Sequence, residues 1–291
     1  MELLDGKKTS LEIQNELSVK VKSLIANGMN PPHLVAVLVG DDGASRTYVN
    51  AKVKACERIG FKSTLYHLSL DTSEIELLKV IKKLNEDDSV DGFIVQLPLP
   101  NHMDDLKITL AISPKKDVDG FHPENVGKMA LGLPTFLPAT PNGVMELLRR
   151  YEIPTEGKNT VVIGRSSIVG TPMSILMSRK SNPGNSTVTL AHSRTKNLEQ
   201  ICKQADILIV AIGIPEFVTS EMVKPNAVVI DVGIHRIKDS SKKNGFRLIG
   251  DVNFSEVSQK CSYITPVPGG VGPMTIASLL MNTYIASNER N

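Results

Sequence analysis

The stretch that decides the fold is Gly164-Arg165-Ser166-Ser167-Ile168-Val169-Gly170-Thr171-Pro172. It follows the apolar segment Asn159–Ile163, which predicts a short buried strand, and precedes Met173–Lys180, which predicts a helix. A strand, a turn of small residues and a helix place backbone N–H groups and the positive helix end against a pyrophosphate. The spacing departs from G-x-G-x-x-G, because Ser166 replaces the second glycine and Gly170 comes one residue late. Alone, so loose a match is weak evidence for a dinucleotide site.

The next predicted strand strengthens this interpretation and indicates which cofactor binds. Thr187–Ala191 ends in His192-Ser193-Arg194-Thr195. NAD enzymes usually carry an acidic residue at this strand end for the ribose 2′-hydroxyl. Here the strand end has no acid, and Arg165 and Arg194 can both lie near it. This arrangement suits a 2′-phosphate, so NADP is favoured over NAD.

Apolar strands alternate with helices along the whole chain. In the first half we expect strands over 34–39, 63–68 and 92–97, and helices over 9–26, 45–59, 73–84 and 104–111. In the second half we expect strands over 161–163, 188–190, 207–210 and 228–231, and helices over 141–151, 173–180, 197–203 and 275–286. Residues 98–140 read as rich in loops, and 238–245 as a polar hairpin or loop.

Unbroken apolar strands separated by helices imply parallel sheets covered on both faces. The predicted fold class is therefore α/β, with two domains separated by a cleft and the second domain Rossmann-like. We expect residues 1–139 and 273–291 to form the first domain, and residues 140–272 to form the second, which would bind NADP.

Composition narrows the class of protein. With 291 residues the chain is long enough for two domains, and 41% hydrophobic with 22% charged residues is typical of a soluble globular protein. A net charge of +2 gives no reason to expect nucleic acid or an anionic membrane as partner. Three widely spaced cysteines indicate reduced thiols, and there is no signal-peptide pattern, so a cytoplasmic location is expected.

Tyr48 and Lys52 stand four residues apart on one predicted helix and so project from the same face. By itself the pair is more often a half-buried tyrosine and a solvated lysine. Its position changes this reading, because the helix follows the strand Leu34–Val39 at the carboxyl end of a parallel sheet, where ligands bind.

Gln96 ends the third predicted strand and is followed by Leu97-Pro98-Leu99-Pro100. The amide must reach water or a polar partner, and the two prolines stiffen the following backbone, as suits a ligand wall. The plainer alternative is a strand-end glutamine followed by an ordinary exit loop.

Two carboxylates flank a glycine turn in Asp117-Val118-Asp119-Gly120-Phe121-His122-Pro123. Such acids are usually turn formers, and His122 before a proline reads as structural. A hard cation is the other option, but its remaining ligands are not evident, so no metal is expected.

The run Pro266-Val267-Pro268-Gly269-Gly270-Val271-Gly272-Pro273-Met274-Thr275 is too rich in glycine and proline for a simple linker. Close approach of the backbone to a flat ligand explains it better.

Taken together, these segments resemble the bifunctional methylenetetrahydrofolate dehydrogenase/methenyltetrahydrofolate cyclohydrolase family over essentially the whole chain. The resemblance is carried by five segments in order: 48–52, 96–100, 116–121, 164–170 and 266–275.

In the folate half, the resemblance implies that Lys52 is the main catalytic group, that Tyr48 packs on the folate and that Gln96 hydrogen-bonds Lys52. It also implies that Asp119 holds the pterin ring. The cleft would be lined by the segment centred on Pro268 and Gly269.

In the cofactor half, the resemblance implies NADP contacts from Gly164, Arg165, Ser166, Ser193 and Ile234. The segment 178–186 is longer than expected, which leaves the placement of Ser193 open. A homodimer formed through the cofactor domain is also implied.

The implied chemistry is oxidation of 5,10-methylenetetrahydrofolate with NADP⁺, followed by hydrolysis of the methenyl product to 10-formyltetrahydrofolate. One alternative is a monofunctional NAD(P)-dependent methylenetetrahydrofolate dehydrogenase. A folate- or nucleotide-binding regulator without catalysis would be expected to have lost Lys52 or Gln96, and both are present.

Overall fold

The computed structural model describes residues 1–242 and 245–290, and the chain divides into two compact units. The N-terminal unit comprises Leu11–Ala139 together with the residues from Ile276 onward. The C-terminal unit comprises Thr140–Thr275 together with Met1–Ser10. Each unit is built on a parallel sheet with helices, which confirms the predicted α/β class.

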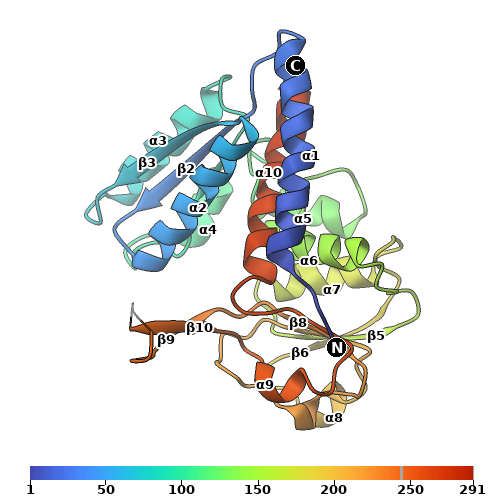
Figure 1. Ribbon diagram of the computed structural model, residues 1–291. Coiled ribbons are helices and arrows are strands. Elements are labelled where there is room, and N and C mark those ends of the chain that lie inside the picture. The colour runs from blue at the N-terminus through green and yellow to red at the C-terminus, as the bar shows by residue number, and fades with distance from the viewer. Residues whose placement is uncertain (243–244, 291) are drawn as a thin grey trace. The chain divides into compact units, whose positions relative to one another are not determined.

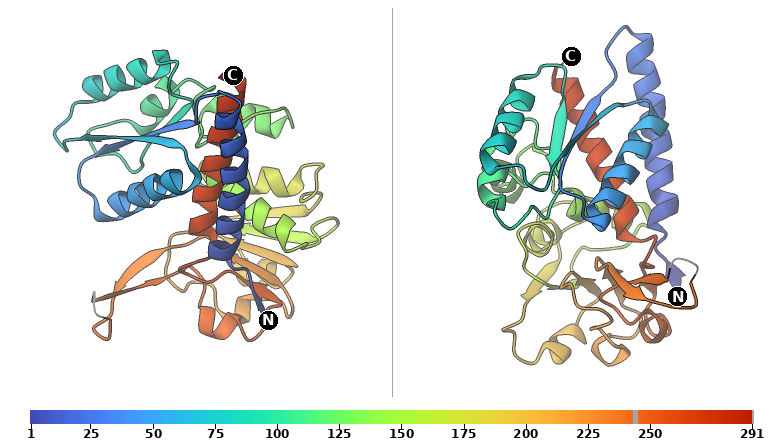
Figure 2. Two further views of the ribbon diagram at one scale, coloured as in Figure 1. Left: turned by 45° about the horizontal axis from the view of Figure 1, so that its top comes forward. Right: turned by 90° about the vertical axis from the view of Figure 1, so that its left-hand side faces the viewer.

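The N-terminal unit contains a three-stranded parallel sheet in the order β3-β2-β4 (Figure 1). The strands are β2 (His33–Val39), β3 (Lys62–Leu68) and β4 (Gly92–Val95). Its helices are α2 (Gly43–Ile59), α3 (Glu74–Glu86), α4 (Asp105–Ala111) and α5 (Pro123–Ala130), with most of α1 (Gly6–Ala26) and α10 (Val271–Arg290). Within this unit α1 and α10 run side by side (Figure 2). The Lys20 ammonium on α1 lies 5.7 Å from the centre of the Tyr284 ring on α10.

All residues of β2 are buried, as expected for a central strand covered on both faces. Alternate residues of β2 and β4, including Val35, Val37 and Phe93, pack with α3 and α4 in one apolar cluster. The helix α3 begins in a capping box, in which Ser73 and Glu76 satisfy each other's backbone N–H groups. The core of this unit thus fixes the carboxyl ends of β2 and β4.

The C-terminal unit contains a six-stranded parallel sheet in the order β1-β11-β8-β7-β5-β6. Its strands are β1 (Glu2–Leu3), β5 (Asn159–Ile163), β6 (Thr187–Ala191), β7 (Ile207–Val210), β8 (Val228–Asp231) and β11 (Tyr263–Ile264). Its helical segments are α6 (Ala139–Arg150), α7 (Gly170–Ser178), α8 (Leu198–Cys202), the 3₁₀ turn η1 (Ser220–Met222) and α9 (Phe254–Val257). From β5 the chain first adds β6 on one side and then returns to add β7 on the other. This reversal is the switch point at which open α/β sheets bind ligands.

Several elements differ from the sequence expectations. The helix α5 was not expected, although Pro123 at its first turn and the His122 cap are start signals. The first ten residues, which we expected in the first domain, belong to the C-terminal unit, because β1 pairs with β11. The strand β4 ends at Val95, two residues before the expected boundary.

The predicted polar hairpin at 238–245 is flanked by two antiparallel strands, β9 (His235–Lys238) and β10 (Phe246–Ile249). Residues 243–244 of that segment lie outside the described residues. No helix within residues 1–242 and 245–290 is long and apolar enough to cross a bilayer.

Candidate active site

Lys52 is a buried amine on α2, the helix that follows β2. Its relative exposure is 6%, and its Nζ donates a hydrogen bond to Gln96 Oε1 over 3.0 Å. Tyr48 lies one helical turn earlier and is partly buried, which raises the pKa of its phenol. Asp42 caps the start of this helix, because its carboxylate accepts a hydrogen bond from Ser45 N at 2.8 Å.

Gln96 is the first residue after β4, and its position is fixed by the sheet. Its backbone N–H donates to Val37 O at 2.9 Å, which continues the pairing of β4 with β2. Its side-chain Nε2 donates to Leu97 O at 2.6 Å, so that Oε1 is the atom left to face Lys52. Because β2 and β4 are parallel, their carboxyl ends meet at one sheet edge and bring Lys52 and Gln96 together.

Asp119 is the second of the two acids in the glycine turn, and its environment differs from that of the first. Asp117 Oδ2 accepts hydrogen bonds from His122 N at 2.7 Å and Asn125 Nδ2 at 2.9 Å, so this carboxylate holds the turn. The Asp119 carboxylate instead interacts electrostatically with Lys52. Asp117 therefore stabilises the turn, as expected for an acid beside a glycine, whereas Asp119 belongs to the Lys52 site.

The segment around Asp119 is held from a distant part of the chain. Asn282 on α10 donates from Nδ2 to Val118 O at 2.8 Å and to Leu137 O at 2.9 Å. Ala139 N donates to Asp119 O at 3.1 Å. The carboxylate is thus presented by a backbone that is anchored on both sides.

Burial and charge oppose each other in this cluster. Burial lowers the pKa of Lys52, and the charge of Asp119 partly restores it. Burial raises the pKa of Asp119, and the charge of Lys52 opposes that change. One turn further along α2, burial raises the pKa of Cys56 to about 12, so this thiol is neutral at physiological pH. Burial thus makes this amine a better candidate to give up and take back a proton than an exposed lysine would be.

The predicted dinucleotide turn lies between β5 and α7, at the switch point of the C-terminal sheet. A Cβ on Gly164 would lie 2.0 Å from Ala211 O, and one on Gly170 would lie 1.9 Å from Gly164 O. Both positions therefore require glycine. Ser166 Oγ accepts hydrogen bonds from Val169 N at 3.2 Å and Gly170 N at 3.4 Å. The serine that replaces the second glycine of the fingerprint caps the start of α7.

The other predicted cofactor residues lie in loops of the same unit. Arg165 follows β5, and Ser193 and Arg194 follow β6; the last residues of these two strands, Ile163 and Ala191, are paired. The side chains of Arg165, Ser193 and Arg194 are exposed, as is Ile234 at 44%. The two arginines thus stand at one edge of the sheet, beside the glycine turn, where they can meet an anionic group.

Pro268 and Gly269 lie in the C-terminal unit, between β11 and α10. Gly269 has φ of +108° and its carbonyl accepts a hydrogen bond from Lys7 N at 2.8 Å. A Cβ on Gly6 would lie 1.8 Å from Gly270 O. Close packing against the start of α1 therefore accounts for part of this glycine run, which we had attributed to a ligand.

Asp231 and Asp251, two buried carboxylates of the C-terminal unit, were not among the residues expected from the sequence. The available signal was an acid at the carboxyl end of the apolar strand Val228–Asp231. Within the described residues no group of three or more His, Cys, Asp or Glu side chains could hold a metal ion. The three cysteines are free and buried.

Comparison with known proteins covers both units. The model of the tetrahydrofolate dehydrogenase/cyclohydrolase catalytic domain matches residues 4–119, and that of the NAD(P)-binding domain of the same family matches residues 138–291. The bifunctional protein FolD of Cytophaga hutchinsonii is 65% identical over 287 residues, which are 99% of this chain and 99% of that protein.

Solved structures agree with these matches. The bifunctional enzyme FolD, methylenetetrahydrofolate dehydrogenase/cyclohydrolase, from Campylobacter jejuni is 51% identical, with a TM-score of 0.93 and full coverage of both chains. The Trypanosoma brucei enzyme, crystallised with NADP cofactor and an inhibitor, is 37% identical with a TM-score of 0.93, covering 98% of this chain and 96% of its own. The resemblance inferred from five sequence segments is confirmed: the chain belongs to the tetrahydrofolate dehydrogenase/cyclohydrolase family.

Proposed function

We propose that this protein oxidises 5,10-methylenetetrahydrofolate with NADP⁺ and hydrolyses the resulting methenyl cation to 10-formyltetrahydrofolate. The observation that carries the proposal is the buried Lys52 amine, 3.0 Å from Gln96 Oε1 and in the field of Asp119. The family membership of both units supports the two activities together.

In the hydrolytic step Lys52 acts as a proton carrier. Water forms a C–O bond with the methenyl carbon, the electrons of the C=N⁺ bond return to nitrogen, and the neutral amine takes the proton of the water. The resulting ammonium then protonates N5, the C–N5 bond breaks, and the hydroxyl proton is released to solvent as the formyl group forms. Gln96 keeps the amine oriented without adding a charge that would hold it protonated.

The remaining residues of the folate site bind and orient the substrate. Tyr48 packs on the folate, and Asp119 accepts hydrogen bonds from the donor edge of the pterin. Holding donor and acceptor in line can supply about 7–11 kcal/mol of the barrier lowering.

The glycine turn fits a dinucleotide, because it joins the end of β5 to the start of α7 at the switch point of the sheet. When bound, NADP⁺ accepts a hydride from the methylene carbon. Gly164, Arg165 and Ser166 would hold it at the end of β5, and Ser193 and Ile234 would hold it from neighbouring loops. Arg165, together with Arg194, would pair with the 2′-phosphate, which gives the preference for NADP.

The test replaces Lys52 with methionine, which keeps the length of the side chain and removes the amine. Cyclohydrolase activity, followed by loss of methenyl absorbance without cofactor, should disappear in Lys52→Met, while hydride transfer is reduced but measurable. Lys54→Met is the matched control, because Lys54 is an exposed lysine on the same helix. Parental hydrolysis by Lys52→Met would show that the lysine is misassigned. Absence of hydrolysis in the parent would favour the monofunctional dehydrogenase.

We further propose a cytoplasmic homodimer assembled through the C-terminal unit, with a small-molecule folate substrate and no nucleic-acid or membrane partner. The balanced charge of +2 supports the absence of such partners. Light scattering coupled to size-exclusion chromatography measures the oligomeric state, and a monomer at micromolar concentration would exclude the dimer.

A further inference from the structure

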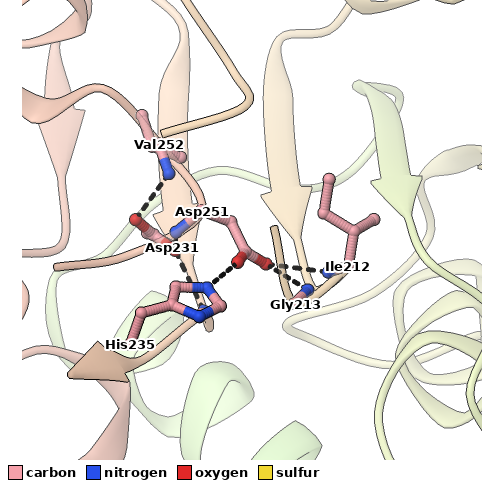
Figure 3. A network of polar contacts seen from close by, with 7 residues as sticks. Ile212, Gly213, Asp231, His235, Asp251 and Val252 are labelled. Atoms are coloured by element: carbon pink, nitrogen blue, oxygen red, sulfur yellow. Dashed lines mark hydrogen bonds and ion pairs between the residues drawn. The ribbon is translucent and has the colours of Figure 1, made fainter. Parts of the chain in front are cut away.

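Two buried carboxylates of the C-terminal unit organise the loops at the carboxyl end of its sheet (Figure 3). Asp251 Oδ2 accepts hydrogen bonds from Ile212 N at 2.8 Å and Gly213 N at 3.0 Å. Asp251 Oδ1 lies 2.7 Å from His235 Nε2. The Asp251 side chain is fully buried, and that of His235 is 18% exposed. One carboxylate therefore ties the loop after β7 to the start of the β9–β10 hairpin.

Asp231, the last residue of β8, holds Asp251 in place. Its Oδ1 accepts from Asp251 N and from Gly233 N, each at 2.9 Å, and its Oδ2 accepts from Val252 N at 2.9 Å. The packing is tight: a Cβ on Gly233 would lie 2.3 Å from Asp251 Cγ. Neither carboxylate has room to change its position without moving the backbone around it.

The two carboxylates hold the chain neighbours of Ile234, one of the expected cofactor contacts. Ile234 lies between Gly233, whose N–H is bound by Asp231, and His235, whose ring is bound by Asp251. The Ile234 side chain itself is 44% exposed.

The same network reaches the dinucleotide turn. Ala211 O lies so close to Gly164 that a Cβ there would approach it within 2.0 Å. The next residue along the chain, Ile212, is the one whose N–H Asp251 binds. The loops after β5 and β7 meet at the switch point of the sheet, and the segment after β8, the next strand, leads to His235. Asp251 binds the loop after β7 and the His235 side chain directly.

We propose that Asp251 is a positioning residue for NADP binding, acting through His235 and the backbone of residues 212–213. It has no assigned contact with the cofactor; it fixes the backbone that presents Ile234 and the loop that supports the glycine turn. The inference rests on the proposed function, because it takes Ile234 and Gly164 as cofactor contacts.

The primary test is Asp251→Asn, which keeps the shape but turns one acceptor into a donor. Isothermal titration of NADP⁺ should show about tenfold weaker binding, equivalent to roughly 1.4 kcal/mol. In steady state, KM for NADP⁺ should rise by a similar factor while kcat falls less. His235→Ala removes the hairpin anchor alone and should also weaken binding, by a smaller factor; it provides the test if Asp251→Asn does not fold.

The matched control is Asp206→Asn in the same unit. Asp206 also accepts a backbone N–H, from Asn159 at 2.9 Å, and pairs with a basic side chain, Lys224, but at the amino end of the sheet. It should lower the melting temperature without changing NADP⁺ affinity. Unchanged affinity in both Asp251→Asn and His235→Ala, or an equal loss in Asp206→Asn, would overturn the proposal. Because titration does not require turnover, an inactive parent that binds NADP⁺ would count against the proposed function and leave this test intact.

Discussion

Two substitutions of Gln96 should move the pH profile of the cyclohydrolase in opposite directions. Gln96→Met removes the oxygen that accepts from Lys52 Nζ at 3.0 Å, and Gln96→Glu replaces it with a carboxylate. If neutral Lys52 is the active form, the rate rises with pH as the ammonium loses its proton. Losing the acceptor favours the neutral amine and lowers the midpoint of the pH-rate profile. An added negative charge favours the ammonium and raises that midpoint.

The magnitudes follow from the contact. A hydrogen bond that involves a charged group is worth about 1.5–3 kcal/mol, so losing it in Gln96→Met should lower the pKa of Lys52. For Gln96→Glu, unit charges at 3.0 Å in an effective dielectric of about 20 interact by about 5.5 kcal/mol. Gln96 is partly exposed, so solvent screening should weaken this interaction, but its sign still raises the pKa of Lys52.

The assay follows methenyl hydrolysis without cofactor across the pH range, with the rate of Lys52→Met subtracted as the background reaction. The midpoint is read separately from the maximal rate, because either variant also loses some positioning of the amine. At a fixed pH below the midpoint, the fraction of neutral amine changes about tenfold when the midpoint moves by about one pH unit. Midpoints that move in the same direction, or that stay unchanged in both variants, would refute the idea that the rise in rate with pH reports the titration of Lys52.

Three further substitutions test the fold and the cofactor turn. Gly164→Ala should raise KM for NADP⁺ strongly, because its Cβ would meet Ala211 O at 2.0 Å; Gly157→Ala, at φ of +68° with open space around it, is the control for backbone strain alone. Ser73→Ala should lower the free energy of unfolding by about 1 kcal/mol, measured by urea titration, through loss of the α3 capping box. Leu77→Ala, at a fully buried position on the same helix, should lower it by about 2–5 kcal/mol; equal effects of Ser73→Ala and Leu77→Ala would contradict the assignment of Leu77 to the core.

The sequence was most informative where a local pattern also fixed a position in space. Lys52 lies on the helix after β2 and Gln96 directly follows β4, so topology placed both near the carboxyl ends of parallel strands. Their hydrogen bond was predicted from the family resemblance. The glycine turn was recognisable because Gly164 and Gly170 are required by close backbone contacts. The family resemblance assigned Asp119 to the folate site before its electrostatic interaction with Lys52 was known.

Other features depend on contacts between distant parts of the chain and could not be predicted from short stretches of sequence. The strand β1 has only two residues and gains its partner, β11, from the far end of the chain. The roles of Asp231 and Asp251 depend on backbone N–H groups supplied by three loops, and no spacing in the sequence records those contacts. The glycines beside Pro268 show that a sequence pattern can also mislead. Close packing against Gly6 requires glycine there, and contact with a ligand would require it equally.

The anchoring of Val118 and Leu137 by Asn282 has a consequence for biosynthesis. Ribosomes deliver the chain from its amino end, so β2, β4 and the Asp119 turn emerge long before α10 does. Until residue 282 is released, the backbone on either side of Asp119 lacks these two hydrogen bonds. The nascent protein can therefore assemble its first sheet early, but it completes the support of Asp119 only after residue 282 has left the ribosome.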